Sequence, residues 1–211
     1  MNVGIVLAGG IGSRFGGDIS KQYRLINGKE VIWYALNALK QSENIDKIVV
    51  VAKNEHIQRI SNQYDVICIE GGESRNGSLK NALDYIHSGF NCEKVIILEA
   101  ARPMIKKEII DDYIGKLNDY DAVITGQHIV DSLGCFKTHS TNRNDFYLIQ
   151  APEAFKFNML YDNFRSDSLL TATNQQLPPD SKLFINFEFV NNNKITYHAD
   201  LAYCEALMKN E

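Results

Sequence analysis

The stretch that decides the fold is Val3-Gly4-Ile5-Val6-Leu7-Ala8-Gly9-Gly10-Ile11-Gly12-Ser13-Arg14-Phe15-Gly16, followed shortly by Lys21-Gln22. A short apolar run that passes directly into a glycine-rich loop is typical of the first strand of an α/β fold and the ligand-binding turn after it. Three glycines within residues 9–12 let a ligand approach the backbone closely, and their N–H groups can point at phosphate oxygens. Because Arg14 and Lys21 add two cations, the stretch predicts a phosphate-binding site.

This loop differs from two widespread phosphate-binding motifs. No Gly-Lys-Ser or Gly-Lys-Thr follows it, so it is not a P-loop. Gly10 and Gly12 are followed by Phe15, where the dinucleotide fingerprint requires another glycine. A glycine-rich turn with an arginine and a lysine on the surface is the alternative interpretation.

Further apolar runs, several of them separated by helical periodicity, continue the pattern of the first strand. Continuous Val/Ile runs indicate strands buried on both faces, as in a parallel sheet covered by helices. We therefore expect a three-layer, Rossmann-like α/β fold with a mostly parallel sheet, formed by residues 1–211 as a single domain. The expected strands are residues 3–7, 47–52, 65–69, 94–98, 122–125 and 183–190, and the expected helices are 31–39, 79–86, 105–117, 158–164 and 200–208.

Residues 128–146 interrupt this regular alternation. They are polar overall but include Val130, Leu133, Cys135 and Phe136, which an isolated hairpin would leave exposed to water. We expect a small protruding arm, with a short hairpin as one form of it, that packs on a second copy of the chain. The sequence therefore predicts a homodimer.

The composition excludes several functional classes. Lys and Arg number 22 against 26 Asp and Glu, so general binding of nucleic acid is not expected. No apolar window reaches the length of a membrane span, and no basic region precedes the first apolar run, so neither a membrane segment nor a signal peptide is expected. The four cysteines form no CxxC pair, and the histidines show no zinc spacing. These features indicate reduced thiols in a cytoplasmic protein.

Two other polar stretches end predicted strands. Residues 71–78 (GGESRNGS) follow the third strand, and residues 99–103 (EAARP) follow the fourth. The carboxyl ends of parallel strands share one edge of the sheet, where ligands bind. There Glu99 can hold Mg²⁺ against phosphates, and Arg102 can pair with a phosphate group. The alternatives are that Ser78 is a helix N-cap and that Glu99 and Arg102 simply pair with each other.

Together these stretches resemble the cytidylyltransferases that form CDP-alditols from 2-C-methyl-D-erythritol 4-phosphate or ribitol 5-phosphate. The family pattern A-[AG]-G-x-G-x-R-[MF]-x5-K-Q matches residues 8–22, and G-G-x-x-R-x-x-S-[VL] matches residues 71–79. The resemblance continues with D-x-x-R-P at residues 99–103, Asp-[ST] at 131–132, Q-T-P-Q-x-F at 150–155, N-[IY]-K-[IV]-T at 192–196 and D-L-x-x-A-E at 200–205.

Most departures from the family pattern lie outside the glycine-rich loops. Ser20 replaces a proline, Glu99 replaces an aspartate and Ala151 replaces a threonine. The acidic segment T-D-[DE]-[AS] is absent, and residues 171–176 read TATNQQ in its region. The differences therefore concentrate on the side of the acceptor, whereas the nucleotide loops are nearly intact.

The resemblance implies the nucleotidyltransferase form of the fold, and transfer of CMP from CTP to a small phosphorylated polyol with Mg²⁺ as cofactor. It implies that Arg14 and Lys21 stabilise the transferring phosphoryl group, while Lys194 and Arg143 hold the acceptor phosphate. Arg102 and Ser132 are further candidates on the acceptor side, and Glu99 is the implied metal ligand. Nucleotide contacts are expected from Leu7, Ala8, Gly9, Gly10, Gly12, Gly72, Glu73, Arg75, Ser78 and Ala100.

Other readings of the same residues stay open at this point. The acceptor can belong to isoprenoid synthesis or to the synthesis of a surface polysaccharide. The chain can also be a nucleotidyltransferase for a different phosphorylated acceptor. The missing acidic segment motivates one more alternative, a protein that binds CTP without turning it over.

Overall fold

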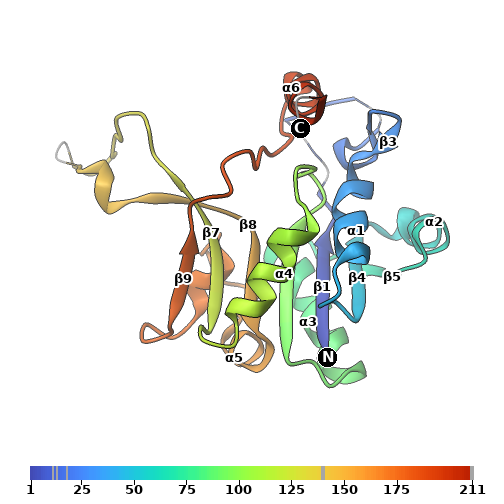
Figure 1. Ribbon diagram of the computed structural model, residues 1–211, viewed down its shortest axis with the longest axis horizontal. Helices are drawn as coiled ribbons and strands as arrows, with labels where there is room; N and C mark the ends of the chain where they lie inside the picture. Colours follow the sequence, from blue (N-terminus) through green and yellow to red (C-terminus); the bar gives the residue numbers. More distant parts are fainter. Residues whose placement is uncertain (11, 13, 18, 139–140, 210–211) are drawn as a thin grey trace.

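The computed structural model describes residues 1–10, 12, 14–17, 19–138 and 141–209. Ile11 and Ser13 of the glycine-rich stretch and residues 139–140 of the arm therefore lie outside the described residues. In the described part of the chain, a seven-stranded sheet forms the centre (Figure 1), with the order β5-β4-β1-β6-β8-β7-β9. Its strands are β1 (Asn2–Leu7), β4 (Lys47–Ala52), β5 (Ile67–Glu70), β6 (Lys94–Glu99), β7 (Ala122–His128), β8 (Tyr147–Lys156) and β9 (Leu183–Asn186).

Most neighbouring strands of this sheet run parallel. β8 is antiparallel to both of its neighbours, β6 and β7, whereas the other four pairings are parallel. A separate ribbon pairs β2 (Leu25–Ile26) with β3 (Lys29–Glu30). The predicted three-layer α/β fold with a mostly parallel sheet is therefore confirmed.

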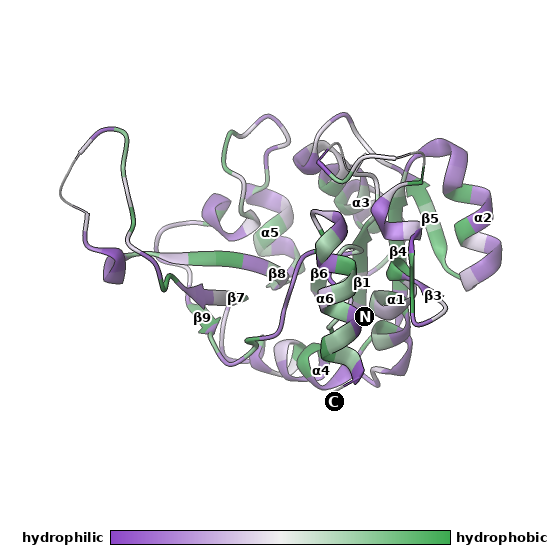
Figure 2. Ribbon diagram, turned by 90° about the horizontal axis from the view of Figure 1, so that it is seen from above, coloured by the Kyte–Doolittle hydropathy of each residue, from purple (hydrophilic) through white to green (hydrophobic). Residues whose placement is uncertain are grey.

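Helices cover both faces of the sheet. Successive residues of a strand point to opposite faces, so Val6 packs under α1 (Val31–Gln41), α2 (Asn54–Tyr64) and α4 (Lys107–Lys116), and Ile5 packs under α3 (Arg75–Gly89) and α5 (Phe157–Asn163). Both side chains are fully buried. Seen from above in Figure 2, hydrophobic residues gather on the strands and on the inner sides of these helices. Two apolar layers, one on each face, thus form the core.

The C-terminal segment folds back over the edge of the sheet that carries the glycine-rich loop. α6 (His198–Lys209) contributes Cys204 to a third apolar cluster with Phe15, Ile26 and Ile195. A carboxylate oxygen of Asp200 accepts hydrogen bonds from the backbone N–H groups of Thr196 and Tyr197, both at 2.7 Å. The Ile195 N–H donates to the Ala101 carbonyl at 2.9 Å, which places the segment before α6 next to the carboxyl end of β6.

Several predicted boundaries are wrong. β5 begins at Ile67 and not at residue 65, because Asp65 has a φ of 48° and ends α2. β9 ends at Asn186 and not at residue 190, because the Asn186 side chain accepts the Glu188 N–H at 2.9 Å and the chain turns there. α2 was not predicted, since its sequence NEHIQRISNQY has few apolar residues and buries fully only Ile60 and Tyr64.

The predicted arm extends from the sheet as a projection of β7 and β8 (Figure 1). These two strands pair as far as His128 and Tyr147. Between them, the described residues contain the short 3₁₀ helix η2 (Arg143–Asp145) and no strand, so the hairpin considered for residues 128–146 is formed by β7 and β8 at the base of the arm. Val130 and Phe136 are highly exposed. Nowhere in the described ranges is a helix long and apolar enough to cross a membrane.

Candidate functional site

A cavity of about 430 Å³ opens where β1, β4 and β6 end and the loop after β5 begins. Backbone hydrogen bonds join these strand ends, from Ala8 N to the Val51 carbonyl at 2.8 Å and from Ala100 N to the Leu7 carbonyl at 3.1 Å. The volume lies in the range of small-molecule sites. Its lining includes these predicted site residues: Leu7, Ala8, Gly9, Gly10, Lys21, Gly72, Glu73, Arg75, Ser78, Glu99, Ala100 and Lys194.

Gln22 holds the glycine-rich loop in place. Its buried amide donates to the carbonyl oxygens of Ala8 at 2.7 Å and Gly10 at 3.1 Å. Gly12 has a φ of +65°, in the left-handed region where glycine is favoured. The loop is therefore shaped by a glutamine inside the predicted motif, which itself lines the cavity.

The second loop is closed by Ser78. The hydroxyl of Ser78 accepts the Gly72 N–H at 3.1 Å and donates to the Gly72 carbonyl at 3.3 Å. A Cβ atom on Gly72 would lie 2.7 Å from the carbonyl carbon of Gly77, so glycine is required there. The N-cap of α3 is Ser74, whose hydroxyl accepts the Gly77 N–H at 2.9 Å. The alternative interpretation of Ser78 as an N-cap is therefore wrong.

Glu99 lies at the centre of a cluster of cations. Its Oε2 atom is 2.8 Å from Lys194 Nζ and 3.1 Å from Arg102 Nε, and its Oε1 atom is 3.8 Å from Arg75 Nε. Burial raises the pKa of this carboxyl, but Lys194, Arg102 and Arg75 outweigh burial and lower the pKa to about 2. Glu99 is therefore an anion that gathers three cations at one wall of the cavity.

Lys194 reaches this wall because the segment before it is fixed to the end of β6. Ile195 N donates to the Ala101 carbonyl at 2.9 Å, and Arg102 Nη1 donates to the Asn192 carbonyl at 2.6 Å. The buried Asn192 side chain in turn donates to the Ala151 carbonyl at 2.7 Å. A residue far along the sequence thus enters the same site as the N-terminal loop.

Lys21 lies beside the same segment. Its ammonium group donates to the Ile195 carbonyl at 2.7 Å. Partial burial lowers the pKa of Lys21, and Lys194 and Arg14 lower it further. Lys53, which follows β4 at the same edge, also lines the cavity and was not predicted; its position directly after a predicted strand is the signal that could have found it. Four cations and two carboxylates line the cavity, so an anionic ligand is favoured.

The structure does not bring every predicted residue to the cavity. Gly12 and Arg14 lie just outside the lining, although Arg14 is near enough to lower the pKa of Lys21. Arg102 is behind the wall, where it pairs with Glu99. Ser132 and Arg143 are in the arm and do not line the cavity, and the Arg143 guanidinium donates to the Val130 carbonyl. Their predicted role on the acceptor side stays a prediction.

The donor set does not fit a Mg²⁺ ion held by protein side chains. Mg²⁺ is usually bound through one or two carboxylates together with substrate phosphates. Here both oxygens of Glu99 already face cations, with Lys194 and Arg102 at hydrogen-bonding distance. Across the described residues, no cluster of three or more His, Cys, Asp or Glu side chains occurs. A divalent cation at Glu99 would be repelled by its neighbours, in contrast to the predicted metal role.

The profile of the family "2-C-methyl-D-erythritol 4-phosphate cytidylyltransferase" matches residues 2–210. An enzyme of that name from Clostridium botulinum is 31% identical over 226 residues, which cover 97% of this chain and 96% of that one. Another from Clostridium perfringens (strain SM101) is 29% identical over 224 residues, or 98% of each chain.

The chain belongs to the 2-C-methyl-D-erythritol 4-phosphate cytidylyltransferase family. It is thus an enzyme of the nucleotidyltransferase class. The crystal structure of a 4-diphosphocytidyl-2C-methyl-D-erythritol synthase from Anaerococcus prevotii superimposes with a TM-score of 0.82 at 21% identity, covering 99% of this chain and 96% of that one. This likeness confirms the fold. The cavity with the glycine-rich loops is accordingly the candidate active site of this family member.

Proposed function

We propose that this enzyme transfers CMP from CTP to the phosphate group of 2-C-methyl-D-erythritol 4-phosphate and releases pyrophosphate. The observation that carries the proposal is the cavity itself, where two glycine-rich loops meet Lys21 and Lys194. The names of the relatives support the choice of this acceptor.

In the proposed reaction, an oxygen of the acceptor phosphate attacks the α-phosphorus of CTP. The new P–O bond forms as the bond between the α-phosphorus and the bridging oxygen breaks, and that oxygen leaves with pyrophosphate. The nucleophile is already an anion at neutral pH, so no general base is needed. The task of the enzyme is to hold two anions together and to stabilise the charge that develops during transfer.

Lys21 fits the task of stabilising the charge that develops during transfer. Its ammonium group is held at the cavity by the Ile195 carbonyl, and its lowered pKa reflects a partly buried cation beside other cations. A bound triphosphate relieves that repulsion. Preorganised donors of this kind act most strongly where water is excluded and charge grows in the transition state.

Lys194 fits the task of holding the acceptor phosphate next to CTP. It projects from a segment that crosses the strand ends, and Glu99 orients its ammonium group at 2.8 Å. A lysine binds a phosphate as a point charge and can both hold and align it. Arg75 was expected to contact the nucleotide, but it shares Glu99 with Lys194, so the proposal assigns both cations to the acceptor half.

Ribitol 5-phosphate is the second candidate acceptor, because the sequence departs from the family pattern on that side. Ala151 replaces a threonine, and residues 171–176 lack the acidic segment. The first acceptor belongs to isoprenoid synthesis, whereas the second belongs to polysaccharide synthesis.

A homodimer joined through the arm is part of the same proposal, since it would bring Ser132 and Arg143 of one copy to the cavity of the other copy.

The test is incubation of the purified enzyme with CTP and each polyol phosphate, with and without Mg²⁺, with products measured by mass spectrometry. We expect the CDP-alditol of 2-C-methyl-D-erythritol 4-phosphate and an equal amount of pyrophosphate, and a rate of product formation lowered by about 10² or more in Lys21→Ala. A higher kcat/KM with ribitol 5-phosphate would change the acceptor. CTP binding without product from any acceptor would leave the third reading, a CTP-binding protein.

A further inference from the structure

A carboxylate is buried in the middle of the sheet, behind the cavity. Glu153 belongs to β8 and lies opposite Ile97 of β6 and Ile124 of β7. Only 2% of its surface is exposed, and it does not line the cavity. Burying a charge among apolar neighbours is costly unless hydrogen bonds and an opposite charge compensate for it. Glu153 therefore needs partners, and their identity indicates what it does.

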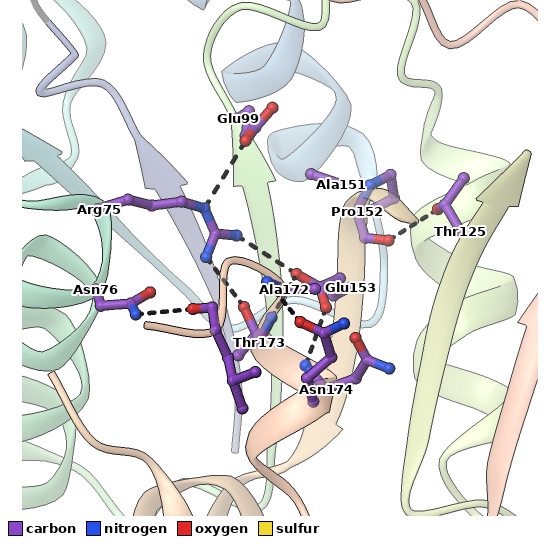
Figure 3. Close-up of polar contacts among 12 residues, drawn as sticks. Arg75, Asn76, Glu99, Thr125, Ala151, Pro152, Glu153, Ala172, Thr173 and Asn174 are labelled. Carbon is purple, nitrogen blue, oxygen red and sulfur yellow. Dashed lines mark hydrogen bonds and ion pairs between the residues drawn. The ribbon is translucent and has the colours of Figure 1, made fainter. Parts of the chain in front are cut away.

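Its partners come from two segments that are distant in the sequence (Figure 3). Glu153 Oε1 is 3.4 Å from Arg75 Nη2, at the start of α3. The backbone N–H groups of Thr173 and Asn174, in the 3₁₀ helix η3 (Thr173–Gln176), donate to the same carboxylate at 3.5 and 3.2 Å. The Thr173 hydroxyl also contacts Arg75 Nη1 at 3.3 Å. Glu153 and η3 together fix the far side of the Arg75 guanidinium.

The near side of Arg75 belongs to the active site. Arg75 lines the cavity, and its Nε atom is 3.8 Å from Glu99, the carboxylate that also holds Lys194. Figure 3 shows the guanidinium between Glu99 on one side and Glu153 with Thr173 on the other. An arginine side chain loses much rotamer freedom when it is fixed. Two carboxylates on opposite sides remove that freedom before any substrate binds.

The position of this carboxylate also bears on the missing acidic segment. The family pattern has glutamine where this chain has Glu153, and has acidic residues in the region where this chain has residues 171–176. The two regions touch each other through Thr173 and Asn174. In this chain, the acid therefore lies on the β8 side of this contact, and the residues on the η3 side are neutral.

We propose that Glu153 is a positioning residue that acts through Arg75: it holds the guanidinium at the acceptor side of the cavity and replaces the absent acidic segment. This proposal rests on the proposed function for its kinetic consequences, but its geometric core, the immobilised Arg75, does not. The requirement is one carboxylate against the far side of Arg75, supplied either by β8 or by η3.

The test compares Glu153→Gln, Thr173→Asp and the double variant Glu153→Gln/Thr173→Asp. Aspartate is close to threonine in size and would place a carboxylate where the Thr173 hydroxyl meets Arg75. For Glu153→Gln we expect kcat/KM for the acceptor to fall about tenfold or more, because small misplacements in an active site are costly. The KM for CTP should stay within about threefold, since Glu153 makes no hydrogen bond to Gly72, Glu73 or Ser78 of the second glycine-rich loop.

The double variant should recover most of the lost kcat/KM. Thr173→Asp alone should harm the enzyme, because it sets two buried carboxylates beside one arginine. The same substitution would then be harmful in the parent and beneficial in Glu153→Gln. A role in stability alone does not predict this change of sign, and the deviation from additivity measures the coupling.

Asp121→Asn is the matched control. Asp121 also uses a carboxylate to hold a loop and a cation, accepting from Lys182 N and Lys156 Nζ, both at 2.9 Å, but it lies just before β7 and does not line the cavity. We expect a lower Tm with an unchanged acceptor KM. If Glu153→Gln behaves like this control, with lower stability and intact kinetics, the proposal is wrong.

A measurement that does not need turnover separates this proposal from the proposed function. Phenylglyoxal modifies accessible arginines, and peptide mass spectrometry can follow Arg75 with Arg59 as an internal reference. Relative to the parent, the Arg75 modification rate should rise several-fold in Glu153→Gln, return in the double variant and stay unchanged in Asp121→Asn. Equal rates in parent and Glu153→Gln would overturn the positioning role. Absence of product from any acceptor in the parent would overturn the function alone.

Discussion

The cavity and the arm differ in how fully a single chain completes them. At the cavity, Lys21, Lys194 and Ser78 each have a partner that fixes them, namely the Ile195 carbonyl, Glu99 and the backbone of Gly72. In the arm, Val130 is 77% exposed and Phe136 is fully exposed. The first region is preorganised by its own chain, whereas the second presents apolar side chains to water. Under the proposed function, we therefore expect that one chain suffices to bind CTP and that a second copy completes the acceptor site.

The largest effect that this comparison predicts is at Lys21. Lys21→Ala removes the cation to which the proposed function assigns stabilisation of the transferring phosphoryl group, and loss of one such group typically costs about 10²–10³ in kcat. Turnover with CTP and acceptor should be measured beside a circular dichroism spectrum. A folded Lys21→Ala enzyme that keeps turnover within about twofold of the parent would remove Lys21 from the mechanism.

Lys194→Ala comes next and tests whether the cavity itself has two halves. We expect turnover to fall by about 10², because misalignment of the acceptor alone can cost that much. CTP affinity, measured by calorimetry, should stay within a few-fold, since Lys194 is held on the acceptor side by Glu99. Loss of CTP binding with an unaltered acceptor KM would instead assign Lys194 to the nucleotide half.

The two regions also differ in how well the sequence predicts them. β1, β4 and β6 are continuous apolar runs, so their boundaries were predicted to within a residue. The motif residues at their carboxyl ends follow from the shared edge of a parallel sheet. α2 was missed because its exposed side is polar and few of its residues are buried, and the network of Arg75, Glu153 and Thr173 depends on contacts between distant segments that no local pattern encodes.

Within the arm, the sequence predicted that a single chain would leave apolar residues exposed, and Val130 and Phe136 are exposed in the structure. Leu133, Cys135 and Phe136 are apolar residues in a polar segment, and the sequence does not say what covers them. In the described single chain, they line a hollow together with Phe146. Arg143 was placed on the acceptor side by resemblance, but its distance from the cavity is set by how far β7 and β8 project.

The arm provides the third prediction. We expect sedimentation to detect a dimer at micromolar concentration and Phe136→Ser to weaken it, because an exposed aromatic side chain is a typical interface anchor. Arg143→Ala should lower kcat/KM for the acceptor by about tenfold, as for a lost charged contact to phosphate. A monomer at all concentrations would leave the arm without the predicted role.

Mixing the impaired Arg143→Ala enzyme with Lys21→Ala tests whether Arg143 acts in the cavity of the other copy. In a mixture of Arg143→Ala and Lys21→Ala, half of the dimers are mixed, and each then has one site with both Lys21 and Arg143. If Arg143 crosses the interface, activity should return to roughly a quarter of the parent's. If Arg143 serves its own chain, every site in the mixture lacks one residue and no activity returns.

The smallest predicted effect is the loss, at acidic pH, of the contribution that Glu99 makes to the stability of the fold. The pKa of Glu99 in the folded protein, about 2, lies below its ordinary value of 4.5, since the surrounding cations outweigh the effect of burial. A depressed pKa means that Glu99 stabilises the fold fully above the unfolded value and loses this contribution as the pH falls from about 4.5 to about 2. The free energy of unfolding should be measured with urea at pH 7, 5 and 3. We expect Glu99→Gln to be less stable than the parent by about 2 kcal/mol at pH 7 and pH 5, and by less at pH 3.

The arm supplies the control for this last comparison. Asp145→Asn removes an exposed carboxylate from η2 and should change the free energy of unfolding by less than about 0.5 kcal/mol at pH 7, as surface substitutions usually do.

The Mg²⁺ concentration for half-maximal turnover should be unchanged in Glu99→Gln, because the oxygens of Glu99 face Lys194, Arg102 and Arg75. A strong shift in that concentration would make Glu99 a metal ligand after all, and the cations around it would then have to move when CTP binds.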